Sequence, residues 1–347
     1  MIRTGVLLTA FGGPGDLDEI APFMCSLLGC EPTQGSLDDA RRRYLTIGGA
    51  SPLPPMAERI AVQLERELNG LPRAEEGEDD SMGFFGVAKT LQRAPQGVRI
   101  PVAVGMLHSE PSIASAVDAL VASGARRIVP ISLSPFEAAV TTGAYRTAVD
   151  LAVAGHEGVS IVEAADYRRS ESFLTALAEN LTAALFDEEM RPHRALVVFT
   201  AHSLPVADVE ADPIYVEQLQ ETAAEVSVRA ELGSADGFDA VPGMQAFGGR
   251  GGVAPWLLAY QSKGRRGGEW LAPDLDDVID AAVANDFGAV VVAPIGFAVD
   301  HMETLYDLDV SAADRALSAG IEFARAKAPN DSEDMIKALA DAVRVVI

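Results

Sequence analysis

The sequence is poor in cysteine and tryptophan, has no long apolar run, and carries far fewer basic than acidic residues. Its 347 residues include two cysteines, two tryptophans, 27 Lys and Arg, and 51 Asp and Glu. Cys25 and Cys30 are too few for a disulfide framework or a four-cysteine zinc or iron–sulfur site, so we interpret them as free thiols. No apolar run approaches the roughly 18 residues that a transmembrane helix needs.

The formal net charge of −24 restricts the class of partner. A field of this sign repels nucleic acid and anionic lipid and attracts metal cations, which excludes nucleic-acid binding as the main role. An anionic substrate would need local basic groups. The opening residues, MIRTGVLLTAFGGPG, contain a short apolar stretch with no small-residue cleavage site, which predicts a strand in a cytoplasmic protein rather than a signal peptide.

Apolar runs alternate with amphipathic segments, which predicts an α/β fold with parallel sheets. The expected strands cover 5–11, 101–106, 127–133, 195–200, 257–261 and 290–295. The expected helices cover 17–28, 36–45, 52–71, 112–123, 214–232, 274–284 and 333–345. We interpret 72–99, which is acidic, as an exposed insertion, and 233–252 as a glycine-rich loop.

A short internal repeat indicates two related halves. The residue pairs GA and PI at 124–125 and 130–131 recur with the same spacing at 288–289 and 294–295. Each copy has a helix before it and an apolar strand across it, as two similar doubly wound units would have. The chain length also suits two domains of roughly 150 residues each.

We therefore predict two Rossmann-like halves, each a parallel sheet flanked by helices, with a cleft between them. The first covers 1–160 and the second 161–327, and a helix at about 328–347 packs back on the first half. Ligands of such sheets bind beyond the carboxyl ends of the strands. Candidate functional residues should therefore directly follow strands.

Three of the five histidines end or follow predicted strands, namely His108, His202 and His301. His202 lies in VVFTAHSLP, where a neutral imidazole with an ordinary pKa near 6.5 could accept a proton or bind a metal ion. The alternative is a core histidine bonded to a backbone carbonyl. His156 and His193 lie in polar turns, which are typical of solvated surface residues.

An acidic stripe follows the last predicted strand. Asp300 and Glu303 have the spacing of a helix capping box, which is the purely structural interpretation. Glu303 and Asp307 are four residues apart and would lie on one helix face, where they could relay protons or cations. A capping box explains Asp300 and Glu303 but not Asp307.

Two segments could supply the basic groups that an anionic substrate needs. Residues 47–52, IGGASP, follow RRRY and could form a nest of N–H groups for a carboxylate, or only a tight turn before a helix. Lys263, Arg265 and Arg266 form a second cluster, which could equally be an exposed loop.

Five segments, in this order, resemble the ferrochelatase family: LLTAFGGP, RRYLTIGGASPL, VVFTAHSLP, AYQSKGRRGGEWLAP and VAPIGFAVDHMETLYDLD. They span almost the whole chain. The short span between GGP and IGGASP resembles bacterial enzymes of actinobacterial type, whose substrate is coproporphyrin III. The resemblance implies an enzyme of haem biosynthesis that inserts Fe²⁺ into a porphyrin.

The resemblance also implies roles for individual residues. His202 matches the histidine beside the inserting metal, and Glu303 matches the carboxylate facing it from the opposite side of the cleft. Asp307 matches the next acid of a proton or metal relay. The acid that often follows one turn later is Ser311 here, which weakens the case for a long carboxylate pathway.

Four further positions match porphyrin-binding positions of the family. Phe11 falls where relatives place an apolar or aromatic side chain against the macrocycle, so no oxygen ligand comes from it. Arg43 and Ser51 match contacts to substrate propionates, and Lys263 is a further candidate for such a contact.

Some actinobacterial relatives carry a [2Fe–2S] cluster on cysteines of the second half, which this chain lacks, so we predict no cluster and regard Fe²⁺ as substrate. Other partners implied are the porphyrin and a downstream haem-pathway enzyme. Membrane contact would be at most peripheral, through 22–28, which we interpret instead as part of an amphipathic core helix. Alternatives left open are protoporphyrin IX as substrate, another tetrapyrrole chelatase, and a non-catalytic haem- or porphyrin-binding protein.

Overall fold

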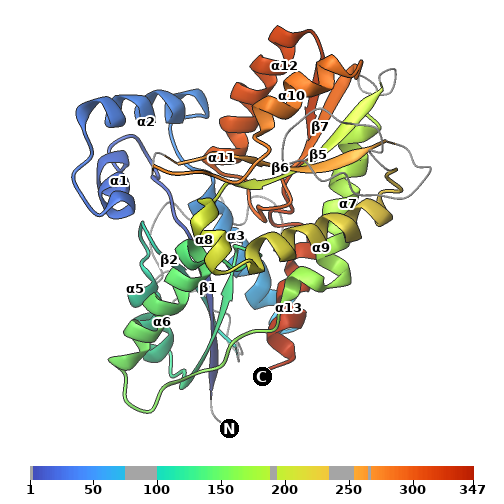
Figure 1. Ribbon diagram of the computed structural model, residues 1–347. Coiled ribbons are helices and arrows are strands. Elements are labelled where there is room, and N and C mark those ends of the chain that lie inside the picture. Colours follow the sequence, from blue (N-terminus) through green and yellow to red (C-terminus); the bar gives the residue numbers. More distant parts are fainter. Residues whose placement is uncertain (1–2, 75–99, 188–193, 234–253, 265–266) are drawn as a thin grey trace. The chain divides into compact units, whose positions relative to one another are not determined.

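The computed structural model describes residues 3–74, 100–187, 194–233, 254–264 and 267–347. The chain divides into two compact units, Met1–Ser172 with Asn330–Ile347, and Phe173–Pro329 (Figure 1). Each unit contains a four-stranded parallel sheet flanked by helices. The predicted α/β class with two parallel sheets is confirmed.

The first unit has the strand order β2-β1-β3-β4. Its strands are β1 (Thr4–Ala10), β2 (Val102–Met106), β3 (Arg127–Ser132) and β4 (Ser160–Ile161). Its helices are α1 (Ile20–Leu28), α2 (Gln34–Thr46), α3 (Leu53–Leu68), α5 (Ile113–Ala122), α6 (Ala144–Ala154), α13 (Glu333–Arg344), the π-helix η1 (Ala139–Gly143) and the 3₁₀-helix η2 (Tyr167–Arg169). Every residue of β1 is buried, as expected of a central parallel strand covered on both faces.

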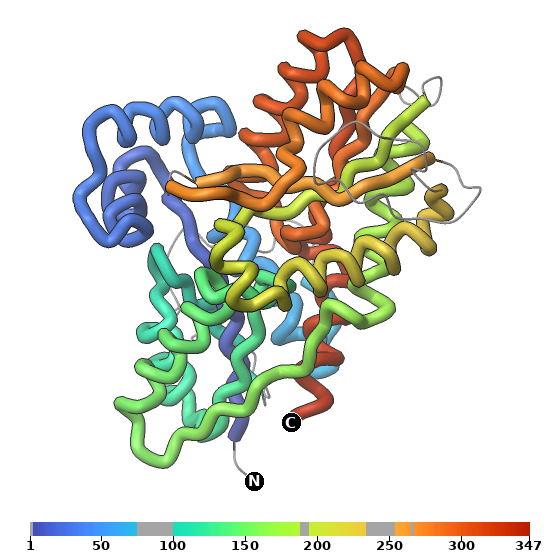
Figure 2. The backbone as a smooth tube through the Cα atoms, viewed as in Figure 1, coloured from blue at the N-terminus to red at the C-terminus, as the bar shows by residue number. Residues whose placement is uncertain are grey.

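Helices cover both faces of this first sheet. Leu7 and Ala103 pack with Leu120 of α5 and Tyr145 of α6 on one face. On the other face α3 packs on β1 and β2, and α13 packs on α3. Figure 2 shows the C-terminal helix, in red, beside the light-blue α3.

The first unit extends to Ser172, beyond the boundary at residue 160 that the sequence analysis placed. The segment after β4 stays with the first unit because it contacts the C-terminal helix. The Ala165 N–H donates to the Ala342 carbonyl at 3.1 Å, and η2 packs against α13.

A buried carboxylate joins α3 to β2. The side chain of Glu65 accepts a hydrogen bond from the Val102 N–H at 3.0 Å, and the residue is only 6% exposed. Burial raises the pKa of Glu65, while the hydrogen bond from Val102 lowers it in part. The contact satisfies a backbone donor at the start of a strand, where an unpaired N–H would be costly.

The second unit repeats this order as β6-β5-β7-β8. Its strands are β5 (Ala195–His202), β6 (Trp256–Gln261), β7 (Ala289–Ala293) and β8 (Glu322–Arg325). Its helices are α7 (Glu171–Leu185), α8 (Val206–Ala211), α9 (Ile214–Arg229), α10 (Leu275–Ala284), α11 (Met302–Leu305), α12 (Ala313–Ala319) and the π-helix η3 (Asp307–Ala312). The short repeat in the sequence therefore falls at β3 and β7, which occupy equivalent places in the two sheets.

The second core has the same layered form. Val198 and Val292 pack with Ile279 of α10 and with Leu308 of η3. The helices α10 and α12 lie on one side of the sheet and α9 on the other (Figure 1). No helix among the described residues combines the length and the apolar character needed to cross a membrane.

One expectation for the first unit is wrong. Residues 22–28 do not lie in a core helix, because Ile20 is the only buried residue of α1 and both Leu27 and Leu28 are exposed. The predictions for most of 72–99 and 233–252, and for His193, Arg265 and Arg266, lie outside the described residues.

Replacing Glu65 by alanine should lower the free energy of unfolding by about 1–3 kcal/mol, because it leaves the Val102 N–H buried without its acceptor. Glu65→Gln keeps an oxygen acceptor and should retain most of the stability. Urea-induced unfolding followed by circular dichroism measures both values. Equal stability of the alanine variant and the unmodified chain would show that the bond contributes nothing.

Candidate active site

The carboxyl end of the second sheet gathers polar side chains. β5 lies between β6 and β7, and all three strands are parallel, so their last residues meet at one edge. His202 is the last residue of β5 and pairs in register with Gln261, the last residue of β6. The chain after β7 turns into the short helix α11, which bears Glu303.

Backbone contacts fix the position of His202. The Tyr215 hydroxyl donates to the His202 carbonyl at 2.9 Å, and the Ser203 N–H donates to the Gln261 carbonyl at 2.8 Å. The Nδ1 atom of His202 lies within hydrogen-bond distance of the Ser203 carbonyl. The other ring nitrogen, Nε2, faces Glu303.

The cap of α11 differs from the predicted one. The N-cap is His301, and its backbone N–H donates to Thr304 Oγ1 at 2.9 Å. The predicted capping box of Asp300 and Glu303 is therefore wrong by one residue. Since Thr304 occupies the capping position, the Glu303 carboxylate points elsewhere.

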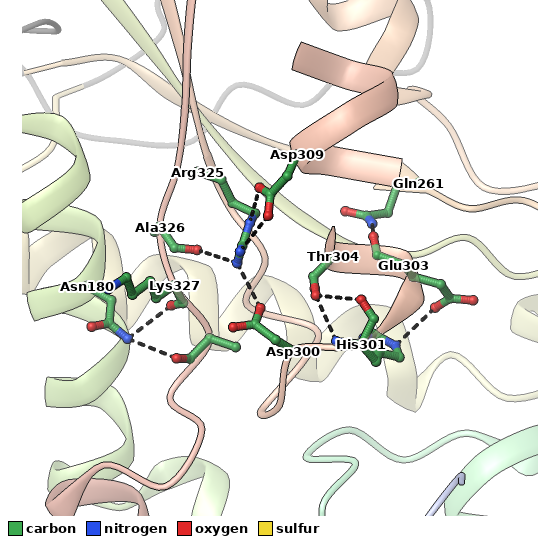
Figure 3. Close-up of polar contacts among 11 residues, drawn as sticks. Asn180, Gln261, Asp300, His301, Glu303, Thr304, Asp309, Arg325, Ala326 and Lys327 are labelled. Carbon is green, nitrogen blue, oxygen red and sulfur yellow. Dashed lines mark hydrogen bonds and ion pairs between the residues drawn. The ribbon is translucent and has the colours of Figure 1, made fainter. Parts of the chain in front are cut away.

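The Glu303 carboxylate lies between two imidazoles. Its Oε1 is 3.2 Å from His202 Nε2, and its Oε2 is 3.4 Å from His301 Nε2, a contact drawn in Figure 3. The side chains of His202 and Glu303 are 31% and 30% exposed, so a ligand can reach the pair. The expectation that they face each other across a gap is wrong for this structure. Both come from one sheet edge, because β5 and β7 are neighbours.

This contact sets the charge state of the pair. Burial lowers the pKa of His202, but the charge of Glu303 and its hydrogen bond, together with the Ser203 carbonyl and the charge of Asp307, outweigh burial and raise that pKa to about 9. Burial raises the pKa of Glu303, and the charges and hydrogen bonds of His202 and His301 lower it far below its ordinary value. At neutral pH the pair is therefore an imidazolium and a carboxylate.

Neighbouring polar groups hold the helical segment that carries the acids. Gln261 Nε2 donates to the Glu303 carbonyl at 2.6 Å. The hydroxyl of Ser262 donates to the Asp307 carboxylate. Ser262 has a positive φ of 59°, which is uncommon for a residue with a side chain and places its hydroxyl beyond the end of β6. Asp307 begins the π-helix η3, one turn after Glu303.

His301 also belongs to this site, although the sequence pattern assigned it no role. Its ring lies 4.8 Å from that of Phe297, and its side chain is 19% exposed. Its Nδ1 is buried with no hydrogen-bond partner in the part of the chain that the structure describes. The sequence did contain a signal for a functional role of His301, because this residue follows a predicted strand and lies two residues before Glu303.

Phe11 lies in the first unit, directly after β1, within an aromatic cluster. Its ring centroid is 4.7 Å from that of His108 and 6.5 Å from that of Phe23. His108 Nδ1 lies 3.0 Å from the Ser26 hydroxyl of α1. The cluster offers an apolar surface, with an imidazole, at the carboxyl end of the first sheet.

The two other first-unit candidates differ in access. Arg43, on α2, is paired with Asp39 at 3.3 Å and remains 41% exposed. Ser51 is buried, its N–H donates to the Pro14 carbonyl, and its hydroxyl accepts from the Leu53 N–H at 3.3 Å. This is the geometry of a tight turn directly before α3, and a propionate contact from Ser51 stays a prediction.

Lys263 is the fourth predicted porphyrin contact. Its Nζ lies 3.6 Å from the carboxylate of Asp274, which caps α10, and its side chain is 64% exposed. Since an exposed ion pair is weak, an anionic ligand could replace Asp274 as the partner of Lys263.

Two kinds of chemistry are open to the His202–Glu303 pair, namely proton transfer and metal ligation. An imidazole nitrogen and carboxylate oxygens are suitable ligands for first-row divalent ions, and the same groups accept protons. In the described residues, no group of three or more His, Cys, Asp or Glu side chains is arranged to hold a metal ion. A metal bound by the pair would therefore take its remaining ligands from elsewhere.

Comparison with known proteins identifies the family. The family model described as Ferrochelatase matches residues 86–346. A ferrochelatase of Thermus thermophilus is 31% identical over 340 residues, which cover 97% of this chain and 98% of that protein. A coproporphyrin III ferrochelatase of Geobacillus thermodenitrificans is 29% identical, covering 98% of this chain and 94% of that protein.

Solved structures show the same fold. The sirohydrochlorin chelatase of Bacillus subtilis subspecies spizizenii, in complex with cobalt, matches with a TM-score of 0.51 and 12% identity, covering 99% of this chain and 94% of that one. At this identity the likeness supports the two Rossmann-like halves and nothing finer. With a family model that spans most of the chain and relatives that match it almost end to end, the chain belongs to the ferrochelatase family of porphyrin metal chelatases.

Proposed function

We propose that this protein inserts Fe²⁺ into a porphyrin, preferably coproporphyrin III, in haem biosynthesis in the cytoplasm. The observation that carries the proposal is the contact of His202 and Glu303 at 3.2 Å on the carboxyl edge of a parallel sheet. Ligands of such sheets bind at this edge. Relatives that match nearly the whole chain are ferrochelatases.

Metal insertion sets three physical demands. Two pyrrole N–H protons must leave, Fe²⁺ must shed water, and the flat macrocycle must bend to expose its nitrogen lone pairs. Bending costs on the order of 1–5 kcal/mol, which remote contacts with the substrate can offset. The protein therefore needs proton acceptors at the ring centre and binding groups at the ring edge.

The proton balance of the pair assigns a role to each member. Because His202 holds the proton at neutral pH, the ionised Glu303 carboxylate would receive Fe²⁺ or a pyrrole proton, in exchange for a contact with His202 or His301. His202 becomes an acceptor or a metal ligand after its own proton leaves. Asp307 supports this exchange because its charge also acts on His202. We propose it as the next acceptor in the relay.

The edge contacts come from the basic side chains. Arg43 is now paired with Asp39, and Lys263 with Asp274, in exposed ion pairs. Substrate propionates would replace these two carboxylates as partners of the basic side chains. Such local pairs act within the Debye length of about 8 Å, so they are effective despite the overall charge of −24. Phe11 would supply an apolar contact to the macrocycle.

The substitutions His202→Ala and Glu303→Gln should each lower the rate of iron insertion at least 100-fold, the low end of general acid–base contributions. Anaerobic assays that follow the absorbance of the metalated porphyrin measure the rates. His156→Ala is the matched control, because His156 belongs to the first unit, where its Nε2 lies 2.8 Å from the carboxylate of Asp118. A folded His202 or Glu303 variant with near-normal activity would remove that residue from the mechanism.

A side-by-side assay should show a higher kcat/KM for coproporphyrin III than for protoporphyrin IX. Coproporphyrin III has more propionate groups, so it offers more partners to Arg43 and Lys263. The chain shares 29% identity with a coproporphyrin III ferrochelatase, which favours the same preference. A higher kcat/KM for protoporphyrin IX would overturn the preference while leaving metal insertion intact. Tight porphyrin binding without turnover would instead indicate a carrier.

A further inference from the structure

One largely buried arginine, Arg325, binds both ends of the segment that carries Glu303 and Asp307. Arg325 ends β8, the edge strand beside β7. Its Nε and Nη2 donate to the two carboxylate oxygens of Asp309, at 2.5 and 2.9 Å. Its Nη1 donates to Asp300 at 2.8 Å and to the Ala326 carbonyl at 3.3 Å (Figure 3).

Two of the three side chains in this network are largely buried. The side chain of Arg325 is 10% exposed and that of Asp300 is 15% exposed, whereas that of Asp309 is 39% exposed. Removing one partner of a buried ion pair leaves the other charge poorly compensated, which costs far more than breaking an exposed pair. The guanidinium therefore fixes Asp300 through a largely buried pair, and it orients the more exposed Asp309 through two hydrogen bonds.

The segment between the two carboxylates contains the acidic part of the site. Asp300 directly precedes His301, and Asp309 lies in η3 two residues after Asp307. Glu303 lies between them, on a helix of only four residues. A helix this short has little stability of its own, so tertiary contacts at its ends must determine its orientation.

We propose that Arg325 is a positioning residue for metal insertion, holding residues 300–309 so that Glu303 stays against His202. This inference rests on the proposed function for the chemistry that Glu303 performs. Arg325 touches neither member of the pair, so it acts through the backbone that it clamps. Its planar fork meets Asp309 with two nitrogens and Asp300 with the third, an arrangement that lysine cannot reproduce.

Three substitutions test the clamp. Arg325→Met removes the charge at similar length, Arg325→Lys keeps the charge without the fork, and Asp309→Asn weakens one end. The matched control is Arg315→Met, which removes the ion pair of Arg315 and Asp280 between α12 and α10 in the same unit. It leaves the acidic segment untouched.

We expect Arg325→Met to lower kcat for iron insertion by roughly 10- to 100-fold, the effect of a small misplacement of a reacting group. Arg325→Lys should recover part of this loss. The KM for porphyrin should stay within about threefold, because the ring-edge contacts are unchanged. Hydrogen–deuterium exchange should rise in peptides covering 300–312 and not elsewhere in the unit. Arg315→Met should change neither kcat nor the exchange of these peptides.

Unchanged kcat and unchanged exchange in the Arg325 variants would overturn the proposal. So would a loss of activity accompanied by faster exchange throughout the unit, which indicates a merely structural role. If Arg325→Met does not fold, Arg325→Lys and Asp309→Asn decide by the same readouts. If the wild-type protein does not insert iron, the proposed function is wrong. Hydrogen–deuterium exchange in residues 300–312 would still decide whether Arg325 holds that segment.

Discussion

The site depends on the ion pair between the His202 imidazolium and the Glu303 carboxylate. Each partner shifts the pKa of the other, upward for His202 and downward for Glu303, against a burial effect of opposite sign. The raised pKa of His202 stabilises the fold fully below its ordinary value near 6.5, and this contribution is lost as the pH rises through about 9. Because the pKa of Glu303 is lowered on folding, this group stabilises the fold above about pH 4.5, and the contribution is lost as the pH falls below that value. The pair therefore contributes most to stability between about pH 4.5 and 6.5, where its two side chains together hold one proton.

The scaffold places this pair by strand adjacency. β5 and β7 are parallel neighbours, so the residues that follow them meet at one edge of the sheet. Separate anchors then fix each member: the Tyr215 hydroxyl on the backbone of His202, and the Gln261 amide on the backbone of Glu303. Arg325 pairs with Asp300 and Asp309, which lie on either side of Glu303 in the same segment. A weakly stable four-residue helix can thereby present a carboxylate in one orientation.

Periodicity and apolar runs sufficed to predict the sheets and to place His202 at a strand end. The contact with Glu303 was less predictable, since it depends on which strands are neighbours, and the sequence indicated this only through a family resemblance and a faint repeat. Its geometry was mispredicted, as was the helix cap. The carboxylate of Asp300 is paired with Arg325, 25 residues away, so the local capping pattern could not reveal its partner. Ser51 shows the reverse case, because its local turn was foreseen while its burial follows from packing.

The most direct test of this account is the pKa of the His202 imidazole, measured from its carbon-bound ring protons by NMR in the ligand-free protein. The account predicts a value of about 9, and a clearly lower value in Glu303→Gln, where burial remains and the opposing charge is gone. A wild-type value at or below the ordinary 6.5, unchanged by the substitution, would contradict the ion pair and the proton balance derived from it.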